Sequence, residues 1–89
     1  MSLQGKVAIV TGSGRGLGLA YARELARQGA AVVVNDVDAA VAEEAAATIT
    51  ADGGRAVAVV APVGSTETAR ALVGAAVENF GGLDILVTN

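Results

Sequence analysis

The residues best suited to chemistry lie in TGSGRGLG, residues 11–18, directly after the apolar run VAIV. The glycines leave backbone N–H groups uncovered, and a helix that begins here adds the positive end of its dipole, so the stretch suits a phosphate. The alternative is that the glycines only permit a tight turn and close packing of a helix on a sheet. The P-loop pattern GxxxxGK[ST] is excluded because no lysine follows, and Leu17 stands where GxGxxG requires its third glycine. The pattern that fits is TGxxxGxG, formed by Thr11, Gly12, Gly16 and Gly18.

Alternating strands and helices must position this loop. Apolar runs predict strands at residues 6–11, 31–35, 56–60 and 84–88. Helical periodicity predicts helices at 15–28, from the N-cap Asp38 to about 51, and from Ser65 or Thr66 to Phe80. Strands separated by helices require crossover connections, so the sheet should be parallel with helices on both faces. We therefore predict an α/β fold, a partial Rossmann-like doubly wound sheet with strand order 3-2-1-4.

The helices should each turn one apolar face to the sheet. The second helix is alanine-rich, and its expected buried residues are Val41, Ala45, Thr48 and Ile49. The third has the clearest amphipathic pattern, and its expected buried residues are Ala69, Leu72, Val73, Ala76, Val77 and Phe80.

Composition excludes several classes of function. The six basic residues are scattered and the net charge is −3, so we expect no nucleic-acid partner. The absence of Cys and His removes disulfides and the commonest zinc ligands, and we expect no metal site. Apolar runs are far shorter than the roughly 20 residues of a membrane helix, so we expect a cytoplasmic protein with no membrane partner.

Three features in the right order resemble the short-chain dehydrogenase/reductase family along the whole chain: the glycine loop, Asp36 after the second strand, and LDILVTN at residues 83–89. LDILVTN is similar to the family's fourth strand and NNAG motif, with Asn89 as the second Asn and Thr88 in place of the first. The resemblance implies that residues 1–89 are the NAD(P)-binding segment, the N-terminal part of a longer single-domain enzyme. That enzyme would transfer hydride between NAD(H) and a small alcohol or ketone.

The resemblance also implies where the cofactor is held. The loop would hold the pyrophosphate, and Asn89 would lie near the ribose on the nicotinamide side and help to fix the active-site backbone. The predicted cofactor-binding residues are Gly12, Ser13, Arg15, Gly16, Leu17, Gly18, Asp36, Val63 and Asn89.

Asp36 indicates which dinucleotide binds. At the end of the second strand its carboxylate can accept hydrogen bonds from the adenosine ribose, although it can also begin the next helix, for which Asp38 is better placed. A 2′-phosphate about 4 Å away would cost on the order of 4 kcal/mol per unit charge. Arg15 is the counterargument, because a guanidinium can pair with that phosphate. We expect NAD, with NADP as the less favoured alternative.

The adenine pocket departs from the family pattern. The family usually has Asp-Val after the third strand, and here Pro62 and Val63 stand in these places. Pro62 has neither a carboxylate nor an N–H, whereas the backbone N–H of Val63 can still bond the ring. We expect weaker adenine binding rather than loss of NAD binding.

Catalytic residues are missing from these 89 residues. The family uses a tyrosine, a lysine four positions later and a serine; the sole tyrosine, Tyr21, is followed by Leu25 and should pack against the sheet. We therefore predict no turnover by this segment alone. The fourth strand would also form an unpaired apolar edge, which invites association, and this favours a segment of a longer protein. We separately expect the full-length protein to be a homo-oligomer.

Two other interpretations stay open. The chain can be a truncated nucleotide-binding or interaction module without catalysis, or another α/β nucleotide-binding fold such as a methyltransferase. The presence of a Ser and a YxxxK motif beyond Asn89 distinguishes the first from an enzyme. The methyltransferase-like fold is distinguished from a dehydrogenase by comparing the affinities for NAD, NADP and S-adenosylmethionine.

Overall fold

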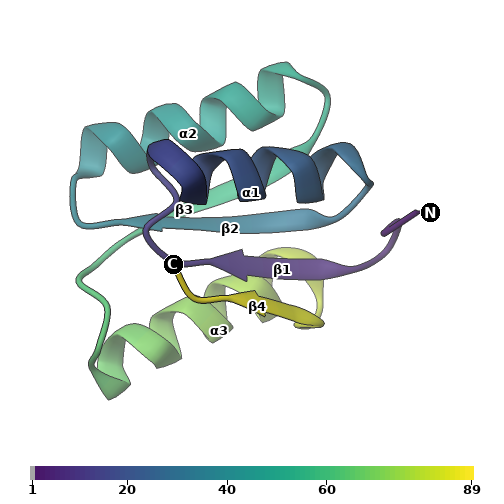
Figure 1. Cartoon of the computed structure of the whole chain (residues 1–89). Helices are drawn as coiled ribbons and strands as arrows, with labels where there is room; N and C mark the ends of the chain where they lie inside the picture. The colour runs from purple at the N-terminus through teal and green to yellow at the C-terminus, as the bar shows by residue number, and fades with distance from the viewer. Residues whose placement is uncertain (1) are drawn as a thin grey trace.

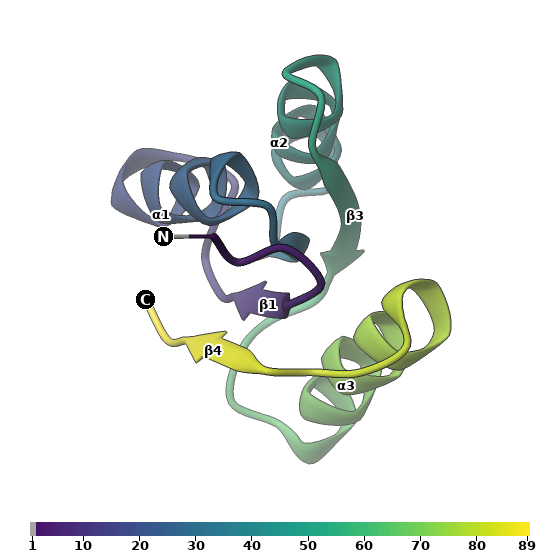
Figure 2. The same ribbon diagram turned by 90° about the vertical axis from the view of Figure 1, so that its right-hand side faces the viewer.

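A computed structural model describes residues 2–89 as four parallel strands that alternate with three helices. The elements are β1 (Val7–Val10), α1 (Gly16–Arg27), β2 (Ala31–Asp36), α2 (Ala39–Ala51), β3 (Arg55–Val60), α3 (Thr66–Phe80) and β4 (Ile85–Val87). The strand order is β3-β2-β1-β4. Helices α1 and α2 cover one face of the sheet and α3 covers the other (Figure 1), and the view in Figure 2 separates these layers. The predicted doubly wound sheet and its strand order are confirmed.

The helix ends follow from local hydrogen bonding. Asp38 caps α2 by accepting from the N–H of Val41 at 3.3 Å, and Ser65 caps α3 by accepting from the N–H of Thr68 at 3.1 Å. Such caps satisfy donors that the first turn of a helix leaves free. Helix α1 differs, because its N-cap residue is Arg15 and no side chain of the described residues caps it. Its first N–H groups are therefore left for another partner.

The core has two halves, one on each face of the sheet. Toward α3 the buried residues are Val7, Ile9, Ala31, Val33, Leu72 and Ala76. Toward α1 and α2 they are Val10, Ala22, Val32, Val34, Ala45 and Ile49. Strands β1 and β2 are buried on both faces, as their continuous apolar runs predict.

Helix α2 is rotated slightly from the predicted face. Its buried residues are Ala42, Ala45 and Ile49, whereas Val41 and Thr48 are half-buried. The small side chain of Ala42 allows α2 to approach the sheet closely. Val41 instead extends toward the glycine loop, where a Cβ placed on Gly14 would overlap its Cγ1.

Helix α3 buries less of its apolar face than its pattern predicts. Leu72 and Ala76 are buried, whereas Val73 is 44% exposed, Val77 is 51% exposed and Ala69 is also exposed. The reason lies in the sheet, because β4 is its edge strand and nothing in residues 2–89 lies beyond it. Among the elements of residues 2–89, none therefore covers the outer side of α3.

Candidate functional site

The glycine loop leaves the carboxyl end of β1 and enters α1 at the centre of the sheet. From β1 the chain continues through α1 to β2 on one side, whereas β4 pairs with β1 on the other side. The C-terminus lies beside the end of β1 (Figure 1). In open α/β sheets, ligands bind where the strand order reverses in this way.

The loop presents a run of free donors. The N–H groups of residues 14–18 have no hydrogen-bond acceptor within residues 2–89. The two preceding N–H groups point into the protein, since Gly12 donates to Asn35 Oδ1 at 3.3 Å and Ser13 donates to the Asn35 carbonyl at 2.7 Å. Free N–H groups at the positive end of a helix dipole suit an anion such as a pyrophosphate.

Three glycines are required here for different reasons. Gly16 has φ of +60°, and a Cβ there would meet no atom of residues 2–89 within 4 Å, so Gly16 is required for the backbone conformation and not for space. A Cβ on Gly18 would overlap the carbonyl oxygen of Gly12 and lie 2.7 Å from Asn89 Nδ2. A Cβ on Gly14 would lie 2.6 Å from Asp36 Oδ2. Gly14 was not among the predicted site residues, and its place between the pattern glycines is the only signal it left.

Asp36 lies next to the loop. It ends β2 and is half-buried, and its Oδ1 accepts from the N–H of Asp38 at 3.2 Å, which holds the carboxylate in place. Its Oδ2 is the atom beside Gly14. The structure therefore brings a carboxylate to the edge of the group of free N–H donors.

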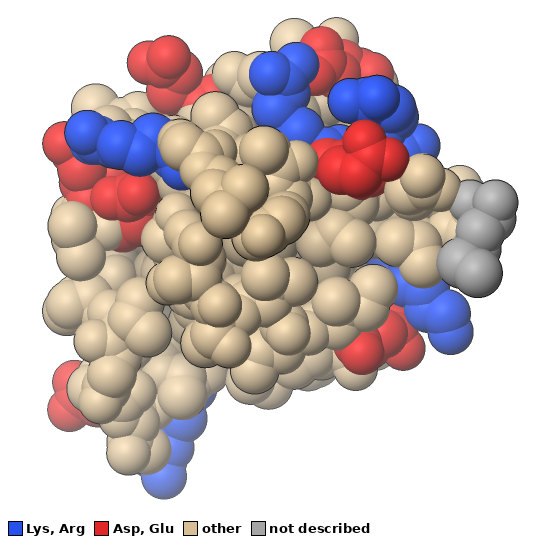
Figure 3. Space-filling view, viewed as in Figure 1, with Lys and Arg blue, Asp and Glu red and all other residues tan. Residues whose placement is uncertain are grey.

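Arg15 faces solvent rather than Asp36. Its guanidinium lies 3.9 Å from the carboxylate of Asp38, with the two side chains 70% and 51% exposed. A pair so exposed contributes little to stability. In Figure 3, basic and acidic groups lie side by side over α1 and α2, and the rest of this face is largely uncharged.

Ser13 supports the loop from inside. Its side chain is fully buried, and its hydroxyl donates to the Val10 carbonyl at 2.7 Å and accepts from the N–H of Asn35 at 2.9 Å. Both its N–H and its hydroxyl have partners within the protein. Direct contact of Ser13 with a cofactor stays a prediction, whereas its supporting role is visible.

Asn89 meets the loop from the other side. Its backbone N–H donates to Thr11 Oγ1 at 3.0 Å and its Nδ2 donates to the Gly12 carbonyl at 3.2 Å. Leu17 is 60% exposed at the start of α1, and Val63 is 55% exposed on the β3–α3 connection. The predicted residues thus lie at or just after the carboxyl ends of the strands, with Val63 on the connection that follows β3 and Asn89 after β4.

Asn35 was missed by the sequence interpretation. It is fully buried, and its Nδ2 donates to the carbonyls of Val59 at 3.1 Å and Ala61 at 3.0 Å. An amide that ends the apolar run AVVVN was the available signal, because a buried polar side chain needs specific partners.

Tyr21 occupies no catalytic arrangement. It was expected to pack against the sheet, but it is 43% exposed on α1, and it lines a shallow pocket with Val87 at the β4 edge.

Within residues 2–89 no three His, Cys, Asp or Glu residues are grouped as metal ligands. Likewise, no helix in that range has the length and apolar character to cross a membrane.

The family model described as short chain dehydrogenase matches residues 6–89. The chain belongs to the short-chain dehydrogenase family. Its relatives include an uncharacterized oxidoreductase of Methylorubrum extorquens, 53% identical over 98% of this chain and 36% of its own. An L-rhamnose 1-dehydrogenase (NAD(P)(+)) of Azotobacter vinelandii is 48% identical over 100% of this chain and 36% of its own.

Solved structures agree with this short-chain dehydrogenase assignment. A crystal structure of hydroxysteroid dehydrogenase from Escherichia coli is 40% identical, with a TM-score of 0.94 over 99% of this chain and 37% of that one. The chain therefore spans little more than a third of the length of the relatives that it matches. The family model and these names place the chain in an oxidoreductase family, and the name of the L-rhamnose dehydrogenase gives NAD(P)(+) as that enzyme's cofactor.

Proposed function

We propose that the chain is the cofactor-binding part of an NAD-dependent oxidoreductase that transfers hydride between NAD(H) and an alcohol or ketone. One observation carries this proposal: the free N–H groups of residues 14–18 lie beside the Asp36 carboxylate where the strand order reverses. The donors suit a pyrophosphate, and the carboxylate suits the hydroxyls of an adenosine ribose. A bound dinucleotide would supply the hydride chemistry, while these residues hold and orient it.

The remaining predicted residues complete the proposed site. The backbone N–H of Val63 would bond the adenine, and Leu17, which is exposed, would contact the cofactor from the start of α1. Asn89 would lie on the nicotinamide side of the loop, where its bonds to Thr11 and Gly12 support that backbone.

The preference for NAD follows from charge. Asp36 Oδ2 lies against the loop, whereas the Arg15 guanidinium is next to Asp38. A 2′-phosphate at the ribose would meet the carboxylate of Asp36 at short range, at a cost on the order of 4 kcal/mol per unit charge for a separation of about 4 Å. NADP is therefore the weaker ligand in this proposal.

Calorimetric titration of the full-length protein with NAD, NADP and S-adenosylmethionine tests the proposal. NAD should bind most tightly, and Asp36→Ala should weaken NAD binding while narrowing the difference between NAD and NADP. Asp52→Ala is the matched control, because that carboxylate pairs with Arg23 on a different surface and should leave both affinities unchanged. Tighter binding of S-adenosylmethionine, or an unchanged ratio in Asp36→Ala, would contradict the proposal.

We also propose that residues 1–89 form the N-terminal part of a longer single-domain enzyme. A groove between α3 and β4 supports this; it has a volume of roughly 240 Å³ and includes Val73, Leu83 and Leu86. Leu86 pairs in register with Ile9 on the α3 face of the sheet, yet it is 61% exposed. An apolar groove of this kind normally lies under another element.

The handedness of crossovers indicates which element covers the groove. The β1–β2 and β2–β3 crossovers carry α1 and α2 on one face as the sheet grows in one direction. A right-handed crossover from β4 that grows the sheet in the opposite direction places its helix on the α3 face. The next helix would therefore lie beside α3, and the catalytic Ser, Tyr and Lys would belong to that part of the enzyme. We propose also that the whole enzyme is cytoplasmic and homo-oligomeric.

Two identical substitutions in α3 test the covered groove. Ala69 lines the groove and Ala71 does not, although both are exposed in residues 2–89. In the full-length protein, Ala69→Asp should lower Tm by several degrees because it buries a charge, whereas Ala71→Asp should change it little. Equal effects of the two substitutions would contradict coverage of the groove.

A further inference from the structure

The side chain of Asn35 connects the two ends of the proposed cofactor site. Its Oδ1 accepts from the N–H of Gly12, and its Nδ2 donates to the carbonyls of Val59 and Ala61 at 3.1 and 3.0 Å. This amide orientation is fixed, because a flipped amide would set NH₂ against N–H and oxygen against two carbonyls. One side chain therefore joins the glycine loop to the carboxyl end of β3.

The backbone of Asn35 strengthens the same connection. Its N–H donates to Ser13 Oγ at 2.9 Å, and its carbonyl accepts from the N–H of Ser13 at 2.7 Å. On the other side, the N–H of Ala61 donates to the Asp36 carbonyl at 3.1 Å. The first residues of the loop and the residues that lead to Val63 are thus held to the same point of β2.

Packing alone does not account for an amide at this position. Asn35 is fully buried at the end of a strand whose preceding residues, Ala31, Val32, Val33 and Val34, are all buried and apolar. A buried polar side chain is tolerated only when its partners are present, and here the partners come from two separate segments. The amide can bond both segments at once because its oxygen accepts from one segment and its NH₂ group donates to the other.

We propose that Asn35 is a positioning residue that holds the glycine loop and the β3–α3 connection at one separation. With that separation set, the adenine and pyrophosphate of one ligand bind together more tightly than either binds alone. Asn35 is 0% exposed and acts through Gly12 and Ala61. This inference rests on the proposed function, since it concerns the same dinucleotide site.

Comparison of two ligands in the full-length protein tests the proposal. Adenosine reaches only the Asp36 and Val63 end, whereas ADP adds the pyrophosphate that reaches the loop. The ratio of the adenosine Kd to the ADP Kd should fall about tenfold in Asn35→Leu, which removes all three side-chain hydrogen bonds. The matched control is Val33→Ala in the same strand, a buried apolar position that should destabilise the protein without changing the ratio.

An unchanged ratio in Asn35→Leu, or an equal fall in Val33→Ala, would overturn the positioning role. If the wild-type protein binds neither ADP nor NAD, the proposed function itself fails, and the two failures are therefore distinguishable.

A measurement on the wild-type protein keeps the test independent of whether Asn35→Leu folds. Adenosine should slow amide hydrogen exchange at Gly12 several-fold, although the Gly12 N–H points into the protein toward Asn35 and not toward the ligand, because Asn35 transmits the ordering of the β3 end. Exchange at Gly12 that is unchanged by saturating adenosine would overturn the proposal.

Discussion

Asn89 Nδ2 donates a hydrogen bond to the carbonyl oxygen of Gly12 at 3.2 Å, across 77 positions of the chain. The backbone N–H of Asn89 bonds Thr11 Oγ1 at the same place. Gly18 lies against both partners of the first bond, since a Cβ there would overlap them. The glycine loop is thus held from the β4 side as well as from Asn35 on the β2 side.

Gly18→Ala should therefore disturb the loop directly. The added methyl group has no space beside the Gly12 carbonyl, and we expect a loss of about 1–3 kcal/mol in the free energy of unfolding together with at least a tenfold weaker NAD affinity. Gly82→Ala is the control, because a Cβ there meets nothing within 4 Å in residues 2–89 and the φ of Gly82 is not in the left-handed region. This substitution should change the free energy of unfolding by no more than about 1 kcal/mol and leave the NAD affinity unchanged. Unfolding and NAD titration of the full-length variants measure both effects. Wild-type NAD affinity in Gly18→Ala would contradict the packing argument.

Ser13→Ala should affect stability more than binding. It removes the hydroxyl that bonds Val10 and Asn35 in the interior, which should cost about 1–3 kcal/mol in the free energy of unfolding. Ser2→Ala is a control at an exposed serine that accepts one bond from Gln4. Denaturant unfolding gives the stability and calorimetry gives the NAD affinity. If Ser13→Ala weakens NAD binding without loss of stability, Ser13 contacts the cofactor directly.

Asp38→Asn should raise the affinity for NADP. Asparagine still caps α2, but it removes the charge that lies 3.9 Å from the Arg15 guanidinium, which is then free to meet a 2′-phosphate. Because the pair is exposed, we expect a change of no more than about fivefold in the ratio of NADP to NAD affinity. The double variant with Arg15→Gln should abolish the gain. A gain that persists without Arg15 would show that Arg15 is not the group involved.

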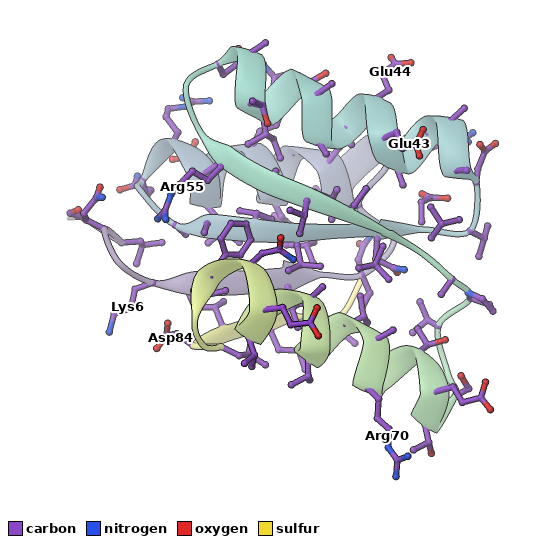
Figure 4. The ribbon with its side chains drawn as sticks, turned by 180° about the vertical axis from the view of Figure 1, so that it is seen from behind. Lys6, Glu43, Glu44, Arg55, Arg70 and Asp84 are labelled. Carbon is purple, nitrogen blue, oxygen red and sulfur yellow. The ribbon has the colours of Figure 1, made fainter. Side chains whose placement is uncertain are left out.

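Asp84→Ala should destabilise the sheet and leave cofactor binding unchanged. Asp84 Oδ2 accepts from the buried N–H of Val7 at 2.9 Å, so its removal leaves that donor unpaired, at a cost of about 1–3 kcal/mol. Asp84 and Lys6 lie together at one end of the sheet (Figure 4), at the start of strands whose carboxyl ends carry the site. Asp84→Asn keeps an acceptor and should recover most of the loss. A change in NAD affinity, measured at a temperature where the variant is folded, would contradict the conclusion that Asp84 acts at the end of the sheet opposite the site.

The order of elements was predictable because each strand is a continuous apolar run, and cap residues or the glycine loop precede the helices. Residues such as Asp38 and Ser65 cap helices through contacts three residues away, so local sequence is sufficient to identify them. The TGxxxGxG spacing likewise located the loop, since its conformation depends on nearby glycines.

Other features depend on distances that the sequence does not contain. In an alanine-rich helix such as α2, hydrophobicity favours burial of Val41 over Ala42, yet the close approach of the helix to the sheet buries the smaller Ala42. The exposure of the outer side of α3 depends on which element lies beyond β4. The role of Asn35 depends on how far the end of β3 lies from Gly12, which only the assembled sheet determines.

The central position of β1 has a consequence for synthesis of the protein. Its partner β2 ends at Asp36, whereas β4 begins at Ile85, so one edge of β1 can pair long before the other. Chains emerge from the ribosome with the N-terminus first, and closing a longer segment carries a larger entropic cost. The support that Asn35 gives to the glycine loop can therefore form while later residues are still being added, and the contact from Asn89 completes the loop last.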